Sequence, residues 1–497
     1  MLERSDLRFI LFSVGFSILF GLIFALSDGD LALSVSILLG ALVISTVPTW
    51  INWSTLRLSL IFIFVFLILD VPSARPYYDY TPITETIGSF MFDAIEKVSS
   101  INGIPFTIFE IISFFILGLS LWKYFLSRHE SSRTRPGIFL LVSFLLPLAA
   151  VWGAISGAAQ GNDLRVAITQ TRFLALYPTW CLIGILSIKN SNDLIKIFKV
   201  ISAAILIKCF HALYIYFFEL GANLTEREFL VDHLTSDFIA TALTFIVVYY
   251  LFNSRNLKIK LASVAACIPL SYVYFLNDRR SSLVGVVLSI VLLLPLLPLA
   301  YFKKYCKVVL GGTILLAGFV AATWSSGGPL GFIARTIQSL MPGGVESTVS
   351  YRALEDYNLL RAVTDNPLLG LGFGRTFPLY VRLPDVSLAY ENFDLIPHNT
   401  VLYLWTFAGP VGIAFLACFS ALSIFLTARL IDFKVSGKMF STTLAAVISF
   451  TMIVRWLVYA YGDIGLLEIR IISLVCLTLG GCAKIYQDRR LNISTEV

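Results

Sequence analysis

The feature that most constrains this chain is a series of apolar stretches that recur between Arg8 and Lys484. Each is roughly 16 to 25 residues long, which is enough to cross a bilayer core of about 30 Å as a helix. Only 14% of the 497 residues are charged, against about 25% in an ordinary soluble protein. The pattern predicts an all-α polytopic membrane protein and excludes a water-soluble globular fold.

Counting the apolar stretches predicts about fourteen transmembrane helices, near residues 9–26, 31–47, 57–71, 106–126, 138–159, 173–188, 197–218, 237–253, 261–276, 281–302, 308–324, 399–428, 440–460 and 471–483. The first stretch could be mistaken for a signal peptide. A second apolar run begins at Leu31, so we interpret the first as an uncleaved span. The seven cysteines fall in or beside apolar runs without a CxxC pattern, which predicts buried thiols rather than a disulfide framework or a zinc site.

The spacing of the spans predicts one integral membrane domain with a large insertion. Residues 1–324 would hold helices 1–11, residues 325–398 would form one long outer loop, and residues 399–497 would hold helices 12–14. Long ordered loops are usually functional. The chain shows no convincing inverted repeat of the kind found in many transporters.

Two outer segments are predicted to contain short helices. In the long loop, apolar and aromatic residues recur every three to four positions over Ser350–Thr364, which predicts a helix. Asn366 and Pro367 would end it, because proline disfavours helical geometry in the preceding residue. The polar and aromatic segment Pro72–Pro105 has a predicted helix around Ser89–Val98.

Basic residues alternate between loops and predict the orientation. With both termini in the cytoplasm, the cytoplasmic ends and loops hold Arg4, Arg8, Lys123, Arg128, Arg133, Arg135, Lys189, Lys196, Arg255, Lys258, Lys260, Lys303, Lys304, Lys307, Lys434, Lys438, Lys484, Arg489 and Arg490. The net charge of +6 reflects this bias and gives no reason to expect nucleic acid as a partner.

The opposite face is rich in arginine and nearly free of lysine. Its one lysine is Lys97, whereas its arginines are Arg75, Arg165, Arg172, Arg227, Arg279, Arg280, Arg335, Arg352, Arg361, Arg375, Arg382 and Arg470. Arginine stays charged, bonds oxyanions bidentately and tolerates partial burial, so the set suits phosphate groups. The alternative for any one of them is a snorkelling side chain or a local salt bridge.

Charges at span ends are candidates for function because they are costly to place there. Arg279 and Arg280 stand between two predicted spans, and Asp278 can pair with only one of them. Lys208 and His211 lie one turn apart in the seventh span and form either an internal pair or a snorkelling lysine. Arg455 in the thirteenth span is equally ambiguous from sequence.

Histidine is the natural general base near neutral pH, and the chain has four. His129 lies in a basic cytoplasmic loop and His233 in a short outer loop. His398 stands where the long outer loop returns to the membrane, so it would face both the loop and the lipid headgroups. The alternative is packing or helix capping, a role that Asn399 or Thr400 serves equally well.

Several motifs in the C-terminal half resemble the O-antigen ligase and O-antigen polymerase family. The segment Asn366–Gly374 reads NPLLGLGFG and resembles the family's turn in its long periplasmic loop. The following His398-Asn399 pair and the segment Phe407–Gly412, which reads FAGPVG, resemble the family's HN and GxxG elements.

Two further elements add to the resemblance, which covers roughly residues 235–430. Ten residues separate Arg361 from Gly372, as in the Arg-x10-Gly element of the polymerases. The segment Asn277–Gly285 resembles the family's SRgxxxG span start, with Arg280 at the arginine, although Asp278-Arg279 replaces the usual serine. The first 160 residues carry no signature of the family.

The resemblance implies a GT-C-like fold and a glycosyltransferase on the periplasmic face of the bacterial inner membrane. Its donor would be a glycan on undecaprenyl diphosphate, transferred with inversion to an acceptor hydroxyl in surface polysaccharide assembly, without a cofactor or metal. The Arg-x10-Gly element slightly favours a polymerase. The alternative is a ligase that transfers the finished chain to lipid A core, and a chain-length regulator protein is a possible partner.

The resemblance also implies roles for individual residues. Arg280, with Arg279, would bind the diphosphate, and His398 would deprotonate the acceptor. The second contacts of the diphosphate would be Arg165, Arg172, Arg352 and Arg361. The loop backbone would turn tightly over the sugar at Gly370, Gly372 and Gly374.

The competing functional class is a transporter, in particular a lipid-linked oligosaccharide flippase. That class predicts short loops on both faces and charges spread through the middle of spans. The long outer loop and the one-sided arginines count against it. A scaffold without activity is less favoured still.

The topology predicts which engineered cysteines an impermeant thiol reagent reaches in intact cells. A cysteine near Gly344, in the long outer loop, should be labelled from outside, and one near Ser131 should be labelled only after permeabilisation. The parent for both variants should lack the seven native cysteines. The opposite labelling pattern would overturn the assignment of every site residue to the outer face.

Overall fold

The computed structural model describes residues 53–71, 82–98, 105–126, 138–222, 230–252, 256–277, 279–296, 299–326, 331–339, 347–384, 394–431 and 438–495. Within these ranges the regular secondary structure is helical, apart from one isolated bridge between Ala94 and Thr107. The predicted spans near 9–26 and 31–47, together with Asp278 and His129, lie outside the described residues.

The N-terminal half of the described chain contains α3 (Thr55–Ile68), α4 (Ile83–Phe92), α5 (Ile95–Val98), α6 (Ile108–Leu126), α7 (Ile138–Ser143), α8 (Leu145–Ala159), α9 (Leu164–Thr171), the 3-10 turn η2 (Arg172–Ala175), α10 (Leu176–Ser187), α11 (Ser191–Tyr214) with its π-helical end η3 (Ile215–Glu219), and α12 (Thr235–Phe245) with its π-helical end η4 (Ile246–Phe252).

The C-terminal half contains α13 (Leu257–Leu276), α14 (Arg280–Leu293), the 3-10 turn η5 (Leu294–Leu296), α15 (Leu299–Ala322), α16 (Phe332–Ser339), α17 (Ser347–Asp365), α18 (Thr400–Leu430), α19 (Lys438–Gly462) and α20 (Ile469–Thr495). The helix predicted over Ser350–Thr364 is confirmed as α17, which ends before Asn366. The helix predicted around Ser89–Val98 is found as parts of α4 and α5.

A multi-pass membrane protein follows from the length and apolar character of these helices. Among the described residues, six helical segments are long and apolar enough to cross a membrane: Ile108–Leu126, Ser191–Glu219, Leu257–Leu276, Thr400–Leu430, Phe440–Gly462 and Ile469–Arg489. In a bilayer the backbone must satisfy its own hydrogen bonds, and a helix does so within one segment. The other predicted spans in the described ranges coincide with shorter apolar helical segments, which in α15 is the part Leu310–Ala322, so their crossing is an expectation.

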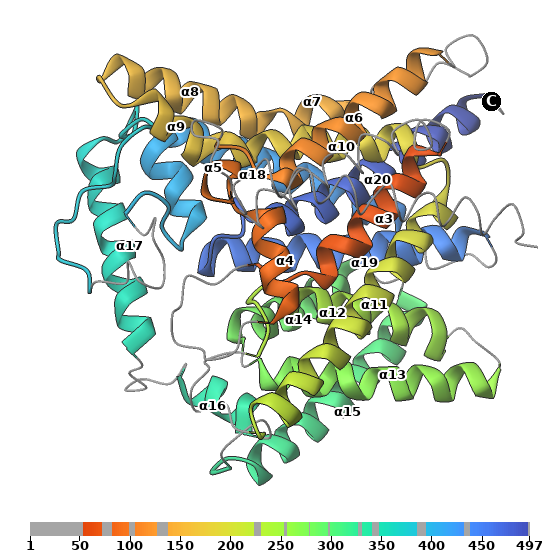
Figure 1. Ribbon diagram of the computed structural model, residues 1–497. Helices are drawn as coiled ribbons and strands as arrows, with labels where there is room; N and C mark the ends of the chain where they lie inside the picture. Colours follow the sequence, from red (N-terminus) through yellow and green to blue (C-terminus); the bar gives the residue numbers. More distant parts are fainter. Residues whose placement is uncertain are drawn as a thin grey trace, which may run out of the picture.

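Helices α19 and α20 form the centre of the bundle. In their most apolar windows 83% and 89% of residues are buried, whereas in α6 the share is 28%. Figure 1 shows the C-terminal ends of α6 and α20 on the right and α17 on the left, at opposite ends of the molecule. The predicted topology expects such a separation, because it places the basic C-terminal ends of α6 and α20 on one side of the membrane and the long loop on the other.

Small residues allow α10 and α20 to pack at backbone distance. A Cβ atom on Gly184 would lie 2.3 Å from the carbonyl oxygen of Leu477, and one on Gly480 would lie 2.2 Å from that of Cys181. Real Cβ atoms do not approach a backbone oxygen so closely. The glycines are therefore required for this contact, as is typical of helix pairs in membranes.

Helix α18 is kinked where its sequence reads Gly409-Pro410. Gly409 has φ 64° and ψ −158°, outside the helical region. Pro410 has no N–H to donate to the Thr406 carbonyl one turn earlier. The backbone N–H of Leu371 donates to the Thr406 carbonyl instead (2.8 Å), and the Gly372 N–H donates to the Phe407 carbonyl (3.0 Å).

The substitution Gly184→Ala should destabilise the protein even though alanine favours helices. The added methyl group collides with the backbone of α20, and such overpacking costs about 1–3 kcal/mol. Gly118→Ala on α6 is the matched control, because a Cβ there meets nothing within 4 Å. Thermal unfolding in detergent should show a lower Tm for Gly184→Ala alone. Equal Tm values for the two variants would contradict the close packing of α10 against α20.

Candidate functional site

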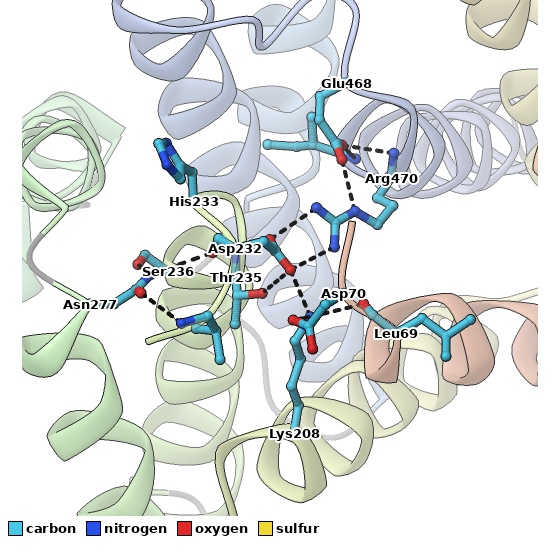
Figure 2. A network of polar contacts seen from close by, with 12 residues as sticks. Leu69, Asp70, Lys208, Asp232, His233, Thr235, Ser236, Asn277, Glu468 and Arg470 are labelled. Atoms are coloured by element: carbon cyan, nitrogen blue, oxygen red, sulfur yellow. Dashed lines mark hydrogen bonds and ion pairs between the residues drawn. The ribbon is translucent and has the colours of Figure 1, made fainter. Parts of the chain in front are cut away.

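A buried lysine joins three elements at one end of the bundle (Figure 2). Lys208 of α11 donates to the carbonyl oxygen of Leu69 (2.9 Å), and its Nζ lies 2.9 Å from Asp70 Oδ1 and 2.8 Å from Asp232 Oδ2. Its side chain is 1% exposed. The snorkelling interpretation of Lys208 is therefore wrong, because the side chain is buried and paired. Its partners are Asp70 and Asp232 rather than the His211 of the sequence-based interpretation.

A buried arginine completes the same cluster from α20. Arg470 donates through its two terminal nitrogens to Asp232 Oδ2 (3.1 Å) and Oδ1 (3.0 Å), and through Nε to Glu468 Oε1 (2.8 Å). A planar guanidinium suits this bidentate geometry. We call Asp70, Lys208, Asp232, Glu468 and Arg470 the ion cluster. The ion cluster connects α11 and α20 with the segment that follows α3 and with the segment that precedes α12.

The ion cluster keeps Asp232 charged. Burial alone would raise the pKa of the Asp232 carboxyl, but the opposing charges of Arg470 and Lys208 outweigh burial and hold it well below its usual range. Arg470, one of the arginines predicted on the outer face, is thus engaged by carboxylates of the protein itself.

Asn277 fixes the short segment before α12 to the start of α14. Its side-chain oxygen accepts from the backbone N–H of Val231 (3.1 Å), and its amide nitrogen donates to Ser236 Oγ (2.8 Å) and to the Asp232 carbonyl (3.4 Å). Asn277 is fully buried. The segment carrying His233 is therefore held next to the one carrying Arg279 and Arg280.

His398 pairs with a buried glutamate of α17. Its Nδ1 lies 3.2 Å from Glu355 Oε1, and its backbone N–H donates to Glu355 Oε2 (2.9 Å). The Glu355 side chain is 0% exposed, whereas that of His398 is 22% exposed. With Nδ1–H donating to the carboxylate, the lone pair of the imidazole is at Nε2.

The capping role falls to Asn399 rather than to His398. Asn399 Oδ1 accepts from the backbone N–H of Leu402 (3.1 Å), and Asn399 Nδ2 donates to Asp356 Oδ1 (3.1 Å). Thr400 donates to the Ala460 carbonyl (2.8 Å). These contacts dock the start of α18 on α17 and α19 and leave the His398 side chain to Glu355.

Nearby arginines favour the neutral form of an imidazole, so the sequence predicts a lowered pKa for His398. This prediction is wrong. Burial lowers the pKa, and Arg352 acts in the same direction. The hydrogen bond to Glu355 and the charges of Asp463 and Glu355 outweigh both, so the pKa lies above its usual value. Sequence could not foresee these two carboxylates, because Glu355 and Asp463 are distant in the chain.

Asp463, between α19 and α20, lies at the centre of the charged groups around His398. Its Oδ2 is 3.5 Å from Nδ1 of His233 and 3.5 Å from a terminal nitrogen of Arg352. Burial would raise its pKa, but His233, Arg352 and His398 outweigh burial and lower it below the usual range. The charge of Arg279 also acts on His233. The structure thus brings together His398, His233, Arg279 and Arg352.

Other predicted contacts of a ligand have partners within the protein. Arg165 pairs with Glu96 (2.9 Å) and is 71% exposed, whereas Arg172 lies 3.5 Å from Glu110 in a buried setting. Arg361 faces outward on α17, 3.7 Å from Asp365. Arg280 is the first residue of α14, beside Arg279.

The three glycines of the loop make tight turns against the bundle. Gly370, Gly372 and Gly374 have φ of 70°, 69° and 103°, which glycine adopts without strain. A Cβ on Gly372 would lie 2.3 Å from the Cα of Gly157 in α8, and one on Gly370 would lie 2.8 Å from the backbone N of Gly409. Packing against α8 accounts for Gly372, and packing against the α18 kink accounts for Gly370. A Cβ on Gly374 would lie 2.4 Å from the carbonyl oxygen of Asp163, just before α9.

Sequence reasoning missed the acidic half of the site. Glu355 and Asp356 lie on the predicted helix of the long loop, one turn after Arg352, and Asp463 and Glu468 lie between two predicted spans. Acidic residues on the arginine-rich face were the available signal. In the described residues no group of three or more His, Cys, Asp or Glu side chains is arranged to hold a metal ion.

The comparison with protein families matches one part of the chain that contributes to this site, and His233, Asp463 and Arg470 lie outside the matched range. Residues 265–417 match the sequence model of the family described as O-antigen ligase. The matched range includes Arg279, Arg280, α17, the glycine turns and His398. The resemblance to the O-antigen ligase and polymerase family is therefore confirmed over this range. No curated protein matches the chain.

Removing Arg470 should destabilise the fold far more than removing Arg165. Arg470→Met leaves Asp232 and Glu468 buried without their main partner, and breaking a buried pair typically costs about 3–5 kcal/mol. Arg165→Met removes an exposed pair worth at most about 1 kcal/mol. Thermal unfolding and membrane abundance should fall sharply only for Arg470→Met. A small effect of that variant would mean that the ion cluster contributes little to stability.

Proposed function

We propose that the protein is a periplasmic-face glycosyltransferase of the bacterial inner membrane. It transfers a glycan from undecaprenyl diphosphate to an acceptor hydroxyl, with inversion, in the assembly of a surface polysaccharide. The match to the O-antigen ligase family supports a role in surface glycan assembly. The observation that carries the proposal is the pairing of His398 with buried Glu355, beside Arg352 and close to Arg279 and His233.

His398 acts as the general base of the transfer. Glu355 holds the proton at Nδ1 and orients the ring, so Nε2 accepts the proton of the acceptor hydroxyl. The hydroxyl oxygen bonds to the anomeric carbon as the bond from that carbon to the diphosphate oxygen breaks. The bonding electrons leave with the diphosphate. Attack from the side opposite the leaving group inverts the anomeric centre.

Arg279 and Arg280 bind the diphosphate, with Arg352 as a further contact from α17. Arginines held in place stabilise charge that develops on a leaving phosphate, because they need not reorganise during the reaction. The Arg352 side chain is 40% exposed and rests on Asp463, so it is positioned without being buried. The donor lipid would lie along the bundle in contact with membrane lipids.

The acceptor distinguishes two versions of the proposal. A polymerase joins the glycan to another lipid-linked glycan, and the Arg361-x10-Gly372 spacing slightly favours it. A ligase transfers the finished chain to lipid A core, which remains the alternative. A chain-length regulator would be a further partner of the polymerase. Neither version requires a metal or a nucleotide sugar.

A flippase predicts charges spread through the middle of spans, and Arg455 of α19 is a buried charge of this kind that has partners within the protein. Arg455 of α19 is 2% exposed and donates to the Asp237 carbonyl (2.7 Å), to Thr241 Oγ1 (2.7 Å) and to the Thr451 carbonyl (3.2 Å). A cation satisfied in this way stabilises helix packing. We therefore favour chemistry at the outer site over transport.

The proposal predicts that purified protein converts a lipid-linked glycan and that His398→Asn does not. General bases contribute about 10²- to 10⁴-fold, so His398→Asn should lose at least about a hundredfold in rate at unchanged protein abundance. Product analysis with two acceptors separates the versions: a longer lipid-linked glycan indicates a polymerase, and a lipid A core conjugate a ligase. Movement of an unaltered glycan would indicate the flippase.

The pH profile provides the control for the role of Glu355. The base must be neutral, and the pKa of His398 lies above its usual value, so the rate should fall as pH drops through a value above about 6.5. Glu355→Gln should move that inflection to lower pH. An unchanged inflection, or a His398→Asn enzyme with the normal rate, would contradict the assignment of His398 as the base.

A further inference from the structure

A second histidine–carboxylate pair lies beside the proposed base and has no part in the transfer step described above. Nδ1 of His233 is 3.5 Å from Asp463 Oδ2, with 31% of the histidine side chain and 11% of the aspartate side chain exposed. Asp463 also contacts Arg352. Figure 2 shows the His233 ring turned away from the ion cluster that holds its neighbour Asp232.

The position of His233 is fixed from two sides. On one side, Asp232 is bound by Lys208 and Arg470 in the buried ion cluster. On the other side, the Asn277 side chain forms hydrogen bonds with the backbone of Val231 and Asp232. Asn277 lies two residues before Arg279, which precedes α14. The backbone of His233 therefore keeps its place relative to the proposed diphosphate site.

The charged groups that face His233 come from several elements. Arg279 approaches from the start of α14, Asp463 from the connection between α19 and α20, and Asp232 from its own segment, while Arg352 of α17 acts through Asp463. Burial and then Arg279 lower the pKa of His233, against the opposing effect of Asp463 and Asp232. In the free protein, burial and Arg279 thus favour the neutral imidazole.

A diphosphate at Arg279 would reverse this balance. It would neutralise the arginine charge that disfavours imidazolium and would place further negative charge next to the ring. Both changes favour the protonated form of histidine. In that form Nδ1–H stays with Asp463, and Nε2–H becomes a donor for an anion.

We propose that His233 is a further binding residue for the diphosphate of the donor: it takes up a proton from solvent as the diphosphate binds, and its Nε2–H then donates to a phosphate oxygen. The inference rests on the proposed function, because it requires the diphosphate to bind at Arg279. Asp463 is the positioning residue that holds the ring and favours its protonation.

Proton uptake makes the binding of diphosphate depend on pH. The affinity for diphosphate rises as pH falls through the range between two pKa values of His233, the higher one in the complex and the lower one in the free protein. Uptake of one proton changes this affinity by at most about tenfold per pH unit. Below both pKa values the contribution is constant. A histidine that only packs in the structure would contribute no such dependence.

The experiment measures the binding of inorganic pyrophosphate to the full-length protein in lipid nanodiscs by calorimetry, in phosphate-free buffers between pH 6 and pH 8.5. Pyrophosphate changes its own protonation over this range, so the readout is the ratio of Kd for His233→Gln to Kd for the unchanged protein. That ratio should increase by about three- to tenfold per pH unit as pH falls through the transition. His211→Gln, on α11, is the matched control and should show a ratio that does not vary with pH.

The outcomes separate this inference from the proposed function. If Arg279→Gln and Arg280→Gln weaken pyrophosphate binding but the His233→Gln ratio is independent of pH, only the role of His233 is overturned. If pyrophosphate does not bind, or binds equally well to both arginine variants, the diphosphate site fails and the inference fails with it. Should His233→Gln not fold, Asp463→Asn provides the second test, since losing the carboxylate should shrink the pH-dependent gain in affinity; an unchanged pH dependence would overturn the proposal.

Discussion

The buried pairing of Asp232 with Arg470 and Lys208 is the interaction on which the arrangement of helices around the site depends. Charges removed from water are expensive, and they persist only when their partners are held in good geometry. Here the partners come from α11, α20 and two connecting segments. The ion pairs therefore hold the helices in position, and the helices in turn hold the charged groups within pairing distance. The segment that carries His233 is held in position because moving Asp232 out of the cluster would leave Lys208 and Arg470 without this carboxylate.

The chemistry of the site is assembled by docking the long loop onto this end. Helix α17 brings Arg352, Glu355 and Asp356 to the start of α18, where each meets a different partner: Asp463, His398 and Asn399. Positively charged side chains suited to a phosphate thus stand beside an imidazole whose basicity is raised by carboxylates. A single helix therefore supplies both a candidate anion contact and the residue that orients the proposed base.

Much of the fold was accessible from sequence, because apolar length and periodicity are local properties. Each predicted span in the described ranges coincides with helix, and α17 matches its prediction to within a few residues. His398, Arg279 and Arg352 were named from residue type and position, and the structure places them around one region. Glu355 and Asp463 could not be named in this way. Glu355 lies 43 residues from His398, and Asp463 lies 230 residues from His233, so no local sequence pattern indicates which carboxylate contacts which histidine. The same reason explains why the pKa of His398 was expected to move in the wrong direction.

The kink of α18 has a consequence for how the chain becomes a membrane protein. A proline inside a spanning helix leaves a carbonyl without its usual donor, and an unsatisfied carbonyl in hydrocarbon costs several kcal/mol. The missing donors come from Leu371 and Gly372, in a segment synthesised before α18. Stable insertion of this helix is therefore coupled to the docking of the turn, and the loop and the span mature as one cooperative unit. A residue inserted between Leu371 and Gly372 would displace one of these two donors from its carbonyl on α18.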